Sequence, residues 1–222
     1  MIKQVIWSSM IDYPKHVSTV IFFDKCNFNC DYCYNKELIN MKAIDFDKEI
    51  LPKLISRKDI VDHIILSGGE CTLANSFSDI VDKLYDSGFT IGIHTNGSNP
   101  QIIKENIDKI SYMGIDIKSS SEKYNDITKC NVNIQNIIDT INLAKNNNKQ
   151  YQCRTTLYPI YVQKEDCIKI AKKLKEMGVK EYTIQQCYNI GSSKEFNQYL
   201  DKELIDIQNE CDKIIKTNLK IK

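Results

Sequence analysis

Three cysteines lie close together near the N-terminus, in the stretch DKCNFNCDYCYNKEL of residues 24–38. Cys26, Cys30 and Cys33 have the spacing C-x3-C-x2-C, and no histidine lies within the loop. Thiolates bind zinc and iron–sulfur clusters, and both kinds of site ordinarily take four protein ligands. The other cysteines are scattered singly, without a second C-x2-C pair. We therefore favour an iron–sulfur cluster with one open iron, and a non-enzymatic zinc-binding module is the alternative.

The composition is that of one globular domain. The chain has 222 residues, 27% of them charged and 42% hydrophobic, with a formal net charge of +1. A domain of this size buries roughly 70% of the surface that its unfolded chain exposes. Only Arg57 and Arg154 are arginines, so bidentate recognition of phosphates or bases is nearly unavailable. We expect no nucleic-acid partner.

The chain shows no targeting segment that we recognise. The N-terminus lacks the apolar stretch of a secretory signal, and no window approaches the ~18 apolar residues of a membrane span. We therefore expect a cytoplasmic protein with no membrane partner. In a reducing compartment the nine cysteines are not expected to form disulfides, which makes metal binding the first question for a cluster of them.

Strand and helix patterns alternate along the chain. Runs rich in β-branched and aromatic residues predict six strands, at 16–23, 63–70, 89–97, 110–118, 150–159 and 180–187. Helical spacing of apolar residues fills the intervals, at 46–58, 77–88, 99–109, 133–148 and 165–178. Gly88 and Gly178 stand where glycines end helices.

This alternation predicts an α/β fold with parallel strands. We expect a partial (β/α)6 TIM-like barrel over about 16–190 and a C-terminal helix over about 194–217, in a single domain spanning 1–222. A flat doubly wound sheet is the competing architecture. Polar clusters follow or end the predicted strands: the cysteine loop, SGGE, HTNG, DIK, RTT and QQC. Because active sites of parallel α/β barrels lie at that rim, the sequence predicts one site there.

These segments together resemble the radical S-adenosylmethionine (SAM) enzymes, and within them the activating enzymes of glycyl-radical enzymes. The resemblance covers residues 8 to about 190. It implies that Cys26, Cys30 and Cys33 hold a [4Fe–4S] cluster whose free iron binds SAM, with Tyr32 against the adenine. The resemblance also implies that the reduced cluster cleaves SAM to a 5′-deoxyadenosyl radical, which abstracts a hydrogen atom.

The resemblance implies the SAM contacts as well. Glycines of the GGE segment let the backbone approach the methionine amine, whose hydrogen bonds Glu70 accepts. Asp116 and Lys118 are expected near the ribose and the carboxylate. The SSMIDYP stretch before the first strand and the pair Gln185-Gln186 resemble the anaerobic ribonucleotide reductase branch. The expected SAM-binding residues are Tyr32, Asn35, Ser67, Gly68, Gly69, Glu70, Thr95, Asn96, Asp116, Lys118 and Arg154.

The implied function is that of an activase. It generates a glycyl radical on a partner enzyme, with anaerobic ribonucleotide reductase favoured, and takes electrons from a flavodoxin or ferredoxin. An incomplete barrel is open along one side, which suits a loop of a partner protein. A radical SAM enzyme acting on a peptide or small molecule is the alternative.

Three positions depart from the family pattern: Tyr34, Cys71 and His94. His94 replaces an acidic residue that helps to hold a monovalent cation in the activating enzymes, so binding of that ion stays open. His94 itself is either a cofactor contact or a hydrogen-bonded strand histidine, and Cys71 is expected to act as a small apolar residue. For Arg154 and Lys118, an ion pair with a protein carboxylate such as Asp116 or Glu70 remains the alternative to a cofactor contact.

Overall fold

A computed structural model describes residues 1–188 and 195–221, whose strands form one sheet. The strand order β1 to β8 follows the chain, and every neighbouring pair is parallel except β1 with β2. The strands are β1 Ile2–Tyr13, β2 His16–Phe23, β3 His63–Gly68, β4 Thr90–Thr95, β5 Ile110–Asp116, β6 Gln150–Leu157, β7 Glu181–Gln186 and β8 Lys216–Lys220.

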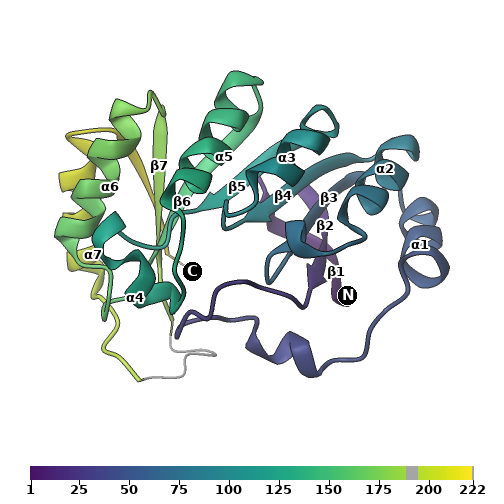
Figure 1. Ribbon diagram of the computed structural model, residues 1–222, viewed down its shortest axis with the longest axis horizontal. Helices are drawn as coiled ribbons and strands as arrows, with labels where there is room; N and C mark the ends of the chain where they lie inside the picture. The colour runs from purple at the N-terminus through teal and green to yellow at the C-terminus, as the bar shows by residue number, and fades with distance from the viewer. Residues whose placement is uncertain (189–194, 222) are drawn as a thin grey trace.

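Helices connect the consecutive parallel strands, β2 to β8. They are α1 Leu51–Ser56, α2 Phe77–Asp86, α3 Pro100–Asn106, α4 Tyr124–Thr128, α5 Ile134–Asn146, α6 Lys164–Glu176 and α7 Asp201–Asp212. Figure 1 shows α2, α3 and α5 along the upper side of the sheet, while the loop after β2 runs below it toward α4 before the chain turns back to α1.

The sheet is an open barrel, because its edge strands β1 and β8 are not paired with each other. The predicted partial barrel is confirmed: β2 to β7 are the six predicted strands, in sequential order. A doubly wound sheet would reverse its strand order part-way, so the competing architecture is wrong. The centre of β3 is buried on both faces, with Ile64, Ile65 and Leu66 fully buried, as expected for a parallel strand between two layers.

Two strands were not predicted. The predicted C-terminal helix ends at Asp212, and the prediction that it continues to 217 is wrong because Lys216–Lys220 forms β8 beside β7. Here Ile215 and Thr217 are buried while Lys216 is exposed, which is a strand period rather than a helical one. The predicted start of this helix near 194 is also wrong, because residues 195–200 are not helical and α7 begins at Asp201. The predicted barrel end near 190 falls outside the described residues. At the other edge, bulges interrupt the pairing of β1 with β2, so its sequence lacks a regular alternation.

The helix ends agree closely with the sequence. The backbone of Gly88 and Gly178 has φ of +74° and +73°, the left-handed conformation that closes α2 and α6. The short helix α4 was not predicted, and it matters because it contacts the loop after β2. No described helix is long and apolar enough to cross a membrane.

Candidate active site

A cavity of about 650 Å³ opens at the carboxyl ends of the parallel strands. It gathers every predicted site residue except Glu70. The predicted residues that line it are Cys26, Cys30, Tyr32, Cys33, Asn35, Ser67, Gly68, Gly69, Thr95, Asn96, Asp116, Lys118 and Arg154. Segments more than a hundred residues apart in the sequence therefore meet in one place, as the barrel topology requires.

The cysteine loop, residues 24–35, is held by backbone hydrogen bonds. Its Asn29 N–H donates to the Thr128 carbonyl at the end of α4 at 2.8 Å, and the Glu70 N–H donates to the Lys25 carbonyl at 2.6 Å. A Cβ on Gly69 would lie 2.2 Å from that same carbonyl oxygen. The glycine therefore lets the loop after β3 approach the cysteine loop, which explains why a side chain is missing at this position.

The far end of the loop is tied to the same segment. The side-chain amide of Asn35 donates to the carbonyl of Gly68 at 2.5 Å. Gly68 itself has φ of +112°, and a Cβ there would lie 2.2 Å from the Phe23 backbone nitrogen. The SGGE segment thus supports both ends of the cysteine loop through its backbone.

The three thiols line the same cavity. Within the described part of the chain, no three His, Cys, Asp or Glu side chains lie close enough together to hold one metal ion. A closed tetrahedral zinc site needs such a group, whereas each thiolate of a cubane binds a different iron. Burial raises the pKa of the Cys30 thiol to about 11, partly offset by the nearby Lys118 ammonium. Iron binding would replace that proton, and Lys118 favours the resulting negative charge.

Tyr32 forms part of the cavity wall. Its side chain is 5% exposed, and its ring lies 5.0 Å from the ring of Tyr158. Its hydroxyl is buried without a hydrogen-bond partner among the described residues. Buried polar groups are normally paired, so this hydroxyl has capacity for a ligand atom.

Glu70 lies behind the cavity wall and is fully buried. Its carboxylate accepts hydrogen bonds from Thr72 Oγ1 at 2.7 Å, Thr95 Oγ1 at 2.8 Å and the Asn96 N–H at 2.6 Å. Burial raises the pKa of Glu70, while these hydrogen bonds lower it. The bonds join the SGGE and HTNG segments, a role that the sequence did not reveal. The predicted contact of Glu70 with the SAM amine stays a prediction.

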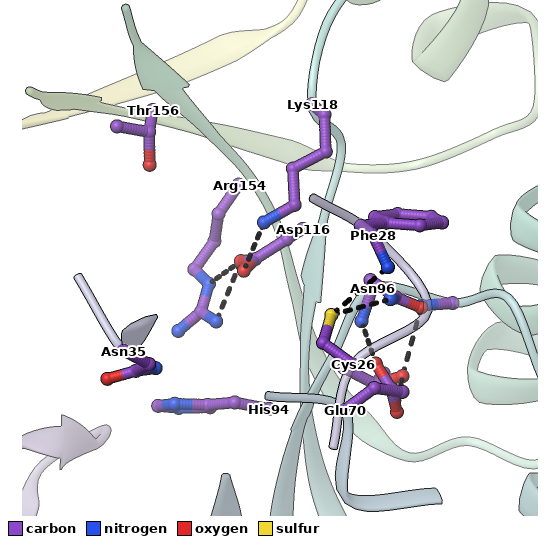
Figure 2. Close-up of polar contacts among 12 residues, drawn as sticks. Cys26, Phe28, Asn35, Glu70, His94, Asn96, Asp116, Lys118, Arg154 and Thr156 are labelled. Atoms are coloured by element: carbon purple, nitrogen blue, oxygen red, sulfur yellow. Dashed lines mark hydrogen bonds and ion pairs between the residues drawn. The ribbon is translucent and has the colours of Figure 1, made fainter. Parts of the chain in front are cut away.

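A partly buried ion triad of Asp116, Lys118 and Arg154 stands at the centre of the site (Figure 2). Arg154 donates to Asp116 Oδ1 from Nε at 2.9 Å and from Nη2 at 2.8 Å, and Lys118 Nζ lies 3.2 Å from Oδ2. The partner of Arg154 is therefore Asp116 and not Glu70. Although burial raises the pKa of Asp116, the two cations hold it well below its usual value. Two cations face one carboxylate, which leaves one positive charge toward the cavity.

His94 packs beside this triad as a neutral side chain. Burial and the neighbouring Arg154 lower its pKa to about 3, and its Nε2 lies 3.1 Å from the Asp12 carbonyl oxygen. A Cβ on Gly114 would lie 2.7 Å from His94 Cδ2 and 2.8 Å from Arg154 Cζ. Gly114 therefore makes room for both side chains. The sequence reading missed it, although a glycine inside a strand can mark a close approach.

Further residues line the cavity or lie next to it. Gln185 and Gln186 line it, as do Asp12 and Lys220 from the two unpredicted strands. Cys71 does not line it and is fully buried, in agreement with a small apolar role. The hydroxyl of Tyr34 accepts a hydrogen bond from the Tyr188 N–H at 2.8 Å, linking the cysteine loop to the end of β7.

Comparison with known proteins identifies the family of the chain. Residues 20–174 match the Radical SAM superfamily. The chain belongs to this superfamily. A [4Fe–4S] cluster and SAM are the cofactors of its members, as the family resemblance implied.

The chain is also similar to individual proteins of known name. It is 37% identical over 194 residues, 84% of this chain and 79% of the relative, to a protein of Methanocaldococcus jannaschii whose name assigns it provisionally to the glycyl-radical enzyme activating enzymes. It is 27% identical to the pyruvate formate-lyase-activating enzyme of Clostridium pasteurianum, over 90% of this chain and 87% of that one. The fold resembles Streptococcus suis SuiB, solved with SAM, with a TM-score of 0.73 and 15% identity over 91% of this chain and 50% of SuiB.

Proposed function

We propose that this radical SAM protein is an activase that generates a glycyl radical on a partner enzyme, with anaerobic ribonucleotide reductase as the favoured partner. The observation that carries the proposal is a cavity holding three cysteines and an ion triad, open to the surface between the edges of an unclosed barrel. The similarity to activating enzymes supports the same reading. An open cavity can accept a loop of a large partner protein, whereas an enclosed pocket could not.

In this proposal Cys26, Cys30 and Cys33 hold the cluster. When bound, the reduced cluster supplies the electron that cleaves SAM to a 5′-deoxyadenosyl radical. Tyr32 and the backbone of the SGGE segment line the space for SAM beside the cluster. The unpaired positive charge of the triad offsets the negative charge of an anionic cluster and binds a ligand carboxylate.

The remaining predicted contacts take supporting roles. Asn35 and Gly69 set the position of the cysteine loop, while Thr95 and Asn96 are oriented by the buried carboxylate of Glu70. The neutral His94 adds no charge to the triad. Because a preorganised site is needed for electron transfer into SAM, we expect these positioning bonds to matter for SAM binding.

The test has two readouts under anaerobic conditions, with dithionite or a flavodoxin as electron donor. Wild-type protein is expected to be brown and to release 5′-deoxyadenosine from SAM, and Cys30→Ala is expected to lose this activity. Cys167→Ala removes a fully buried cysteine of α6 that does not line the cavity, so it serves as the matched control. A colourless protein with bound zinc and no SAM cleavage would contradict the proposal.

The second readout identifies the substrate. Incubation with anaerobic ribonucleotide reductase is expected to give the doublet electron paramagnetic resonance signal of a glycyl radical. SAM cleavage without a radical on any glycyl-radical protein would redirect the assignment to a radical SAM enzyme acting on a peptide or small molecule.

A further inference from the structure

β8 is an edge strand of the sheet. The strand pairs with β7 from Glu181↔Lys216 to Gln185↔Lys220, and no described strand pairs with its other side. A free strand edge presents backbone N–H and C=O groups that an extended polypeptide can bind by adding a strand. Proteins usually cover such edges, so an open one beside a catalytic cavity needs an explanation.

Side chains of α7 cap the first part of this edge. The Thr217 N–H donates to Asp212 Oδ1 at 2.7 Å, and the Thr217 carbonyl accepts from Gln208 Nε2 at 3.0 Å. The backbone of Thr217 thus faces away from β7. Because backbone groups alternate between the two sides of a strand, Leu219 and Ile221 face the same open side, beyond the reach of this cap.

The uncapped part of the edge is also a wall of the active-site cavity. Leu219, Lys220 and Ile221 line the cavity, together with Ile11 from β1 at the opposite edge of the sheet. Apolar side chains are exposed around this opening: Ile11 is 69% exposed, Ile221 46% and Tyr34 44%. A group of exposed apolar residues next to a free strand edge is typical of a protein-binding surface.

These features select one kind of occupant. A small molecule would use the apolar rim but not the row of backbone donors and acceptors, whereas an extended peptide uses both. We propose that an extended segment of the partner enzyme pairs with the edge of β8 at Leu219 and just beyond it at Ile221, so that the glycine it carries enters the cavity. This inference rests on the proposed activase function and specifies how the partner binds.

The experiment compares two variants at one position. Both Leu219→Pro and Leu219→Ala remove the leucine side chain, but only proline removes the outward N–H. Proline is tolerated on a strand edge where that N–H faces solvent, so Leu219→Pro is expected to fold. The affinity of each cluster-loaded variant for full-length anaerobic ribonucleotide reductase is measured by anaerobic calorimetry. Loss of one backbone hydrogen bond predicts a Kd about 3- to 10-fold higher for Leu219→Pro than for Leu219→Ala.

Hydrogen–deuterium exchange of the wild-type complex gives a second, independent measurement. The amides of Leu219 and Ile221 are expected to exchange more slowly after the reductase is added. Unchanged exchange at both amides would overturn the inference, and so would equal Kd values for two folded variants. If Leu219→Pro does not fold, the exchange result decides alone. Protection of these amides before the partner is added would assign the edge to a second copy or to this chain itself, and would also overturn it.

The outcome is separable from the proposed function. A glycyl radical on the reductase with no change at the β8 edge refutes only the strand-pairing inference. Absence of any glycyl radical, with SAM cleavage intact, refutes the activase proposal instead.

Discussion

Replacement of His94 by glutamine is expected to change how stability depends on pH. The imidazole is 12% exposed, and its pKa falls from 6.5 to about 3 because of burial and the neighbouring Arg154. Between these values the unfolded chain binds a proton that the folded protein does not. The free energy of unfolding therefore decreases as the pH falls from 6.5 toward 3, by about 1.4 kcal/mol per pH unit from this group alone.

At pH 5 the His94 contribution amounts to about 2 kcal/mol of lost stability, and above pH 7.5 it vanishes. His94→Gln keeps an amide that can donate to the Asp12 carbonyl but has no proton to gain. We expect the variant to be less stable than wild type at pH 8, because its packing is altered, and to lose less stability on acidification. The difference in the free energy of unfolding between wild type and His94→Gln should therefore become about 2 kcal/mol smaller from pH 8 to pH 5.

Urea denaturation of cluster-free wild type and His94→Gln, followed by circular dichroism at several pH values, measures this difference. Other titrating groups are common to both proteins, so their effects cancel. Parallel pH profiles for the two proteins would refute the reasoning. A His94 pKa near 6.5 in an NMR titration would refute its premise directly.

Three further substitutions test other parts of the site. Asp116→Asn leaves two cations of the triad without their counter-charge, so the free energy of unfolding measured by urea denaturation should fall by about 3 kcal/mol. This is the low end of the range for a buried ion pair, because the carboxylate is 30% exposed. Glu70→Gln cannot accept all of the present hydrogen bonds, so the free energy of unfolding should fall by about 1–3 kcal/mol and calorimetry should show weaker SAM binding. Wild-type stability and wild-type SAM affinity in this variant would argue against the positioning role. Gly69→Ala forces its Cβ against the Lys25 carbonyl, so the iron and sulfide content after reconstitution should drop. Gly178→Ala is the control: its φ of +73° costs backbone strain, but its Cβ would lie 3.9 Å from the nearest atom and Gly178 does not line the cavity, so the iron content should be kept. Equal iron contents in the two glycine variants would count against a tight contact at the cysteine loop.

The sequence by itself determined the fold class and the loop that carries the candidate cluster ligands. Three cysteines at close spacing are a local signal, because the loop that carries them is continuous in the chain. The alternation of strand and helix patterns predicted parallel strands joined by helices, whereas the strand order that rules out a doubly wound sheet came from the structure. The position of each polar motif then followed from the strand that precedes it, which is why the cavity contains nearly every predicted residue.

Tertiary structure decided which of these residues touch one another. The carboxylate of Glu70 turned away from the cavity, and Arg154 paired with Asp116, because strand register and side-chain direction set these contacts. Gly114 owes its role to two side chains that meet in space beside it.

The strand β8 depends even more on distant contacts. Its lysine-rich sequence continues the pattern of the preceding helix, and it becomes a strand because the edge of β7 is available for pairing. Tertiary context overrides local propensity in such a segment, since a strand is stabilised by a neighbour that the local sequence does not contain.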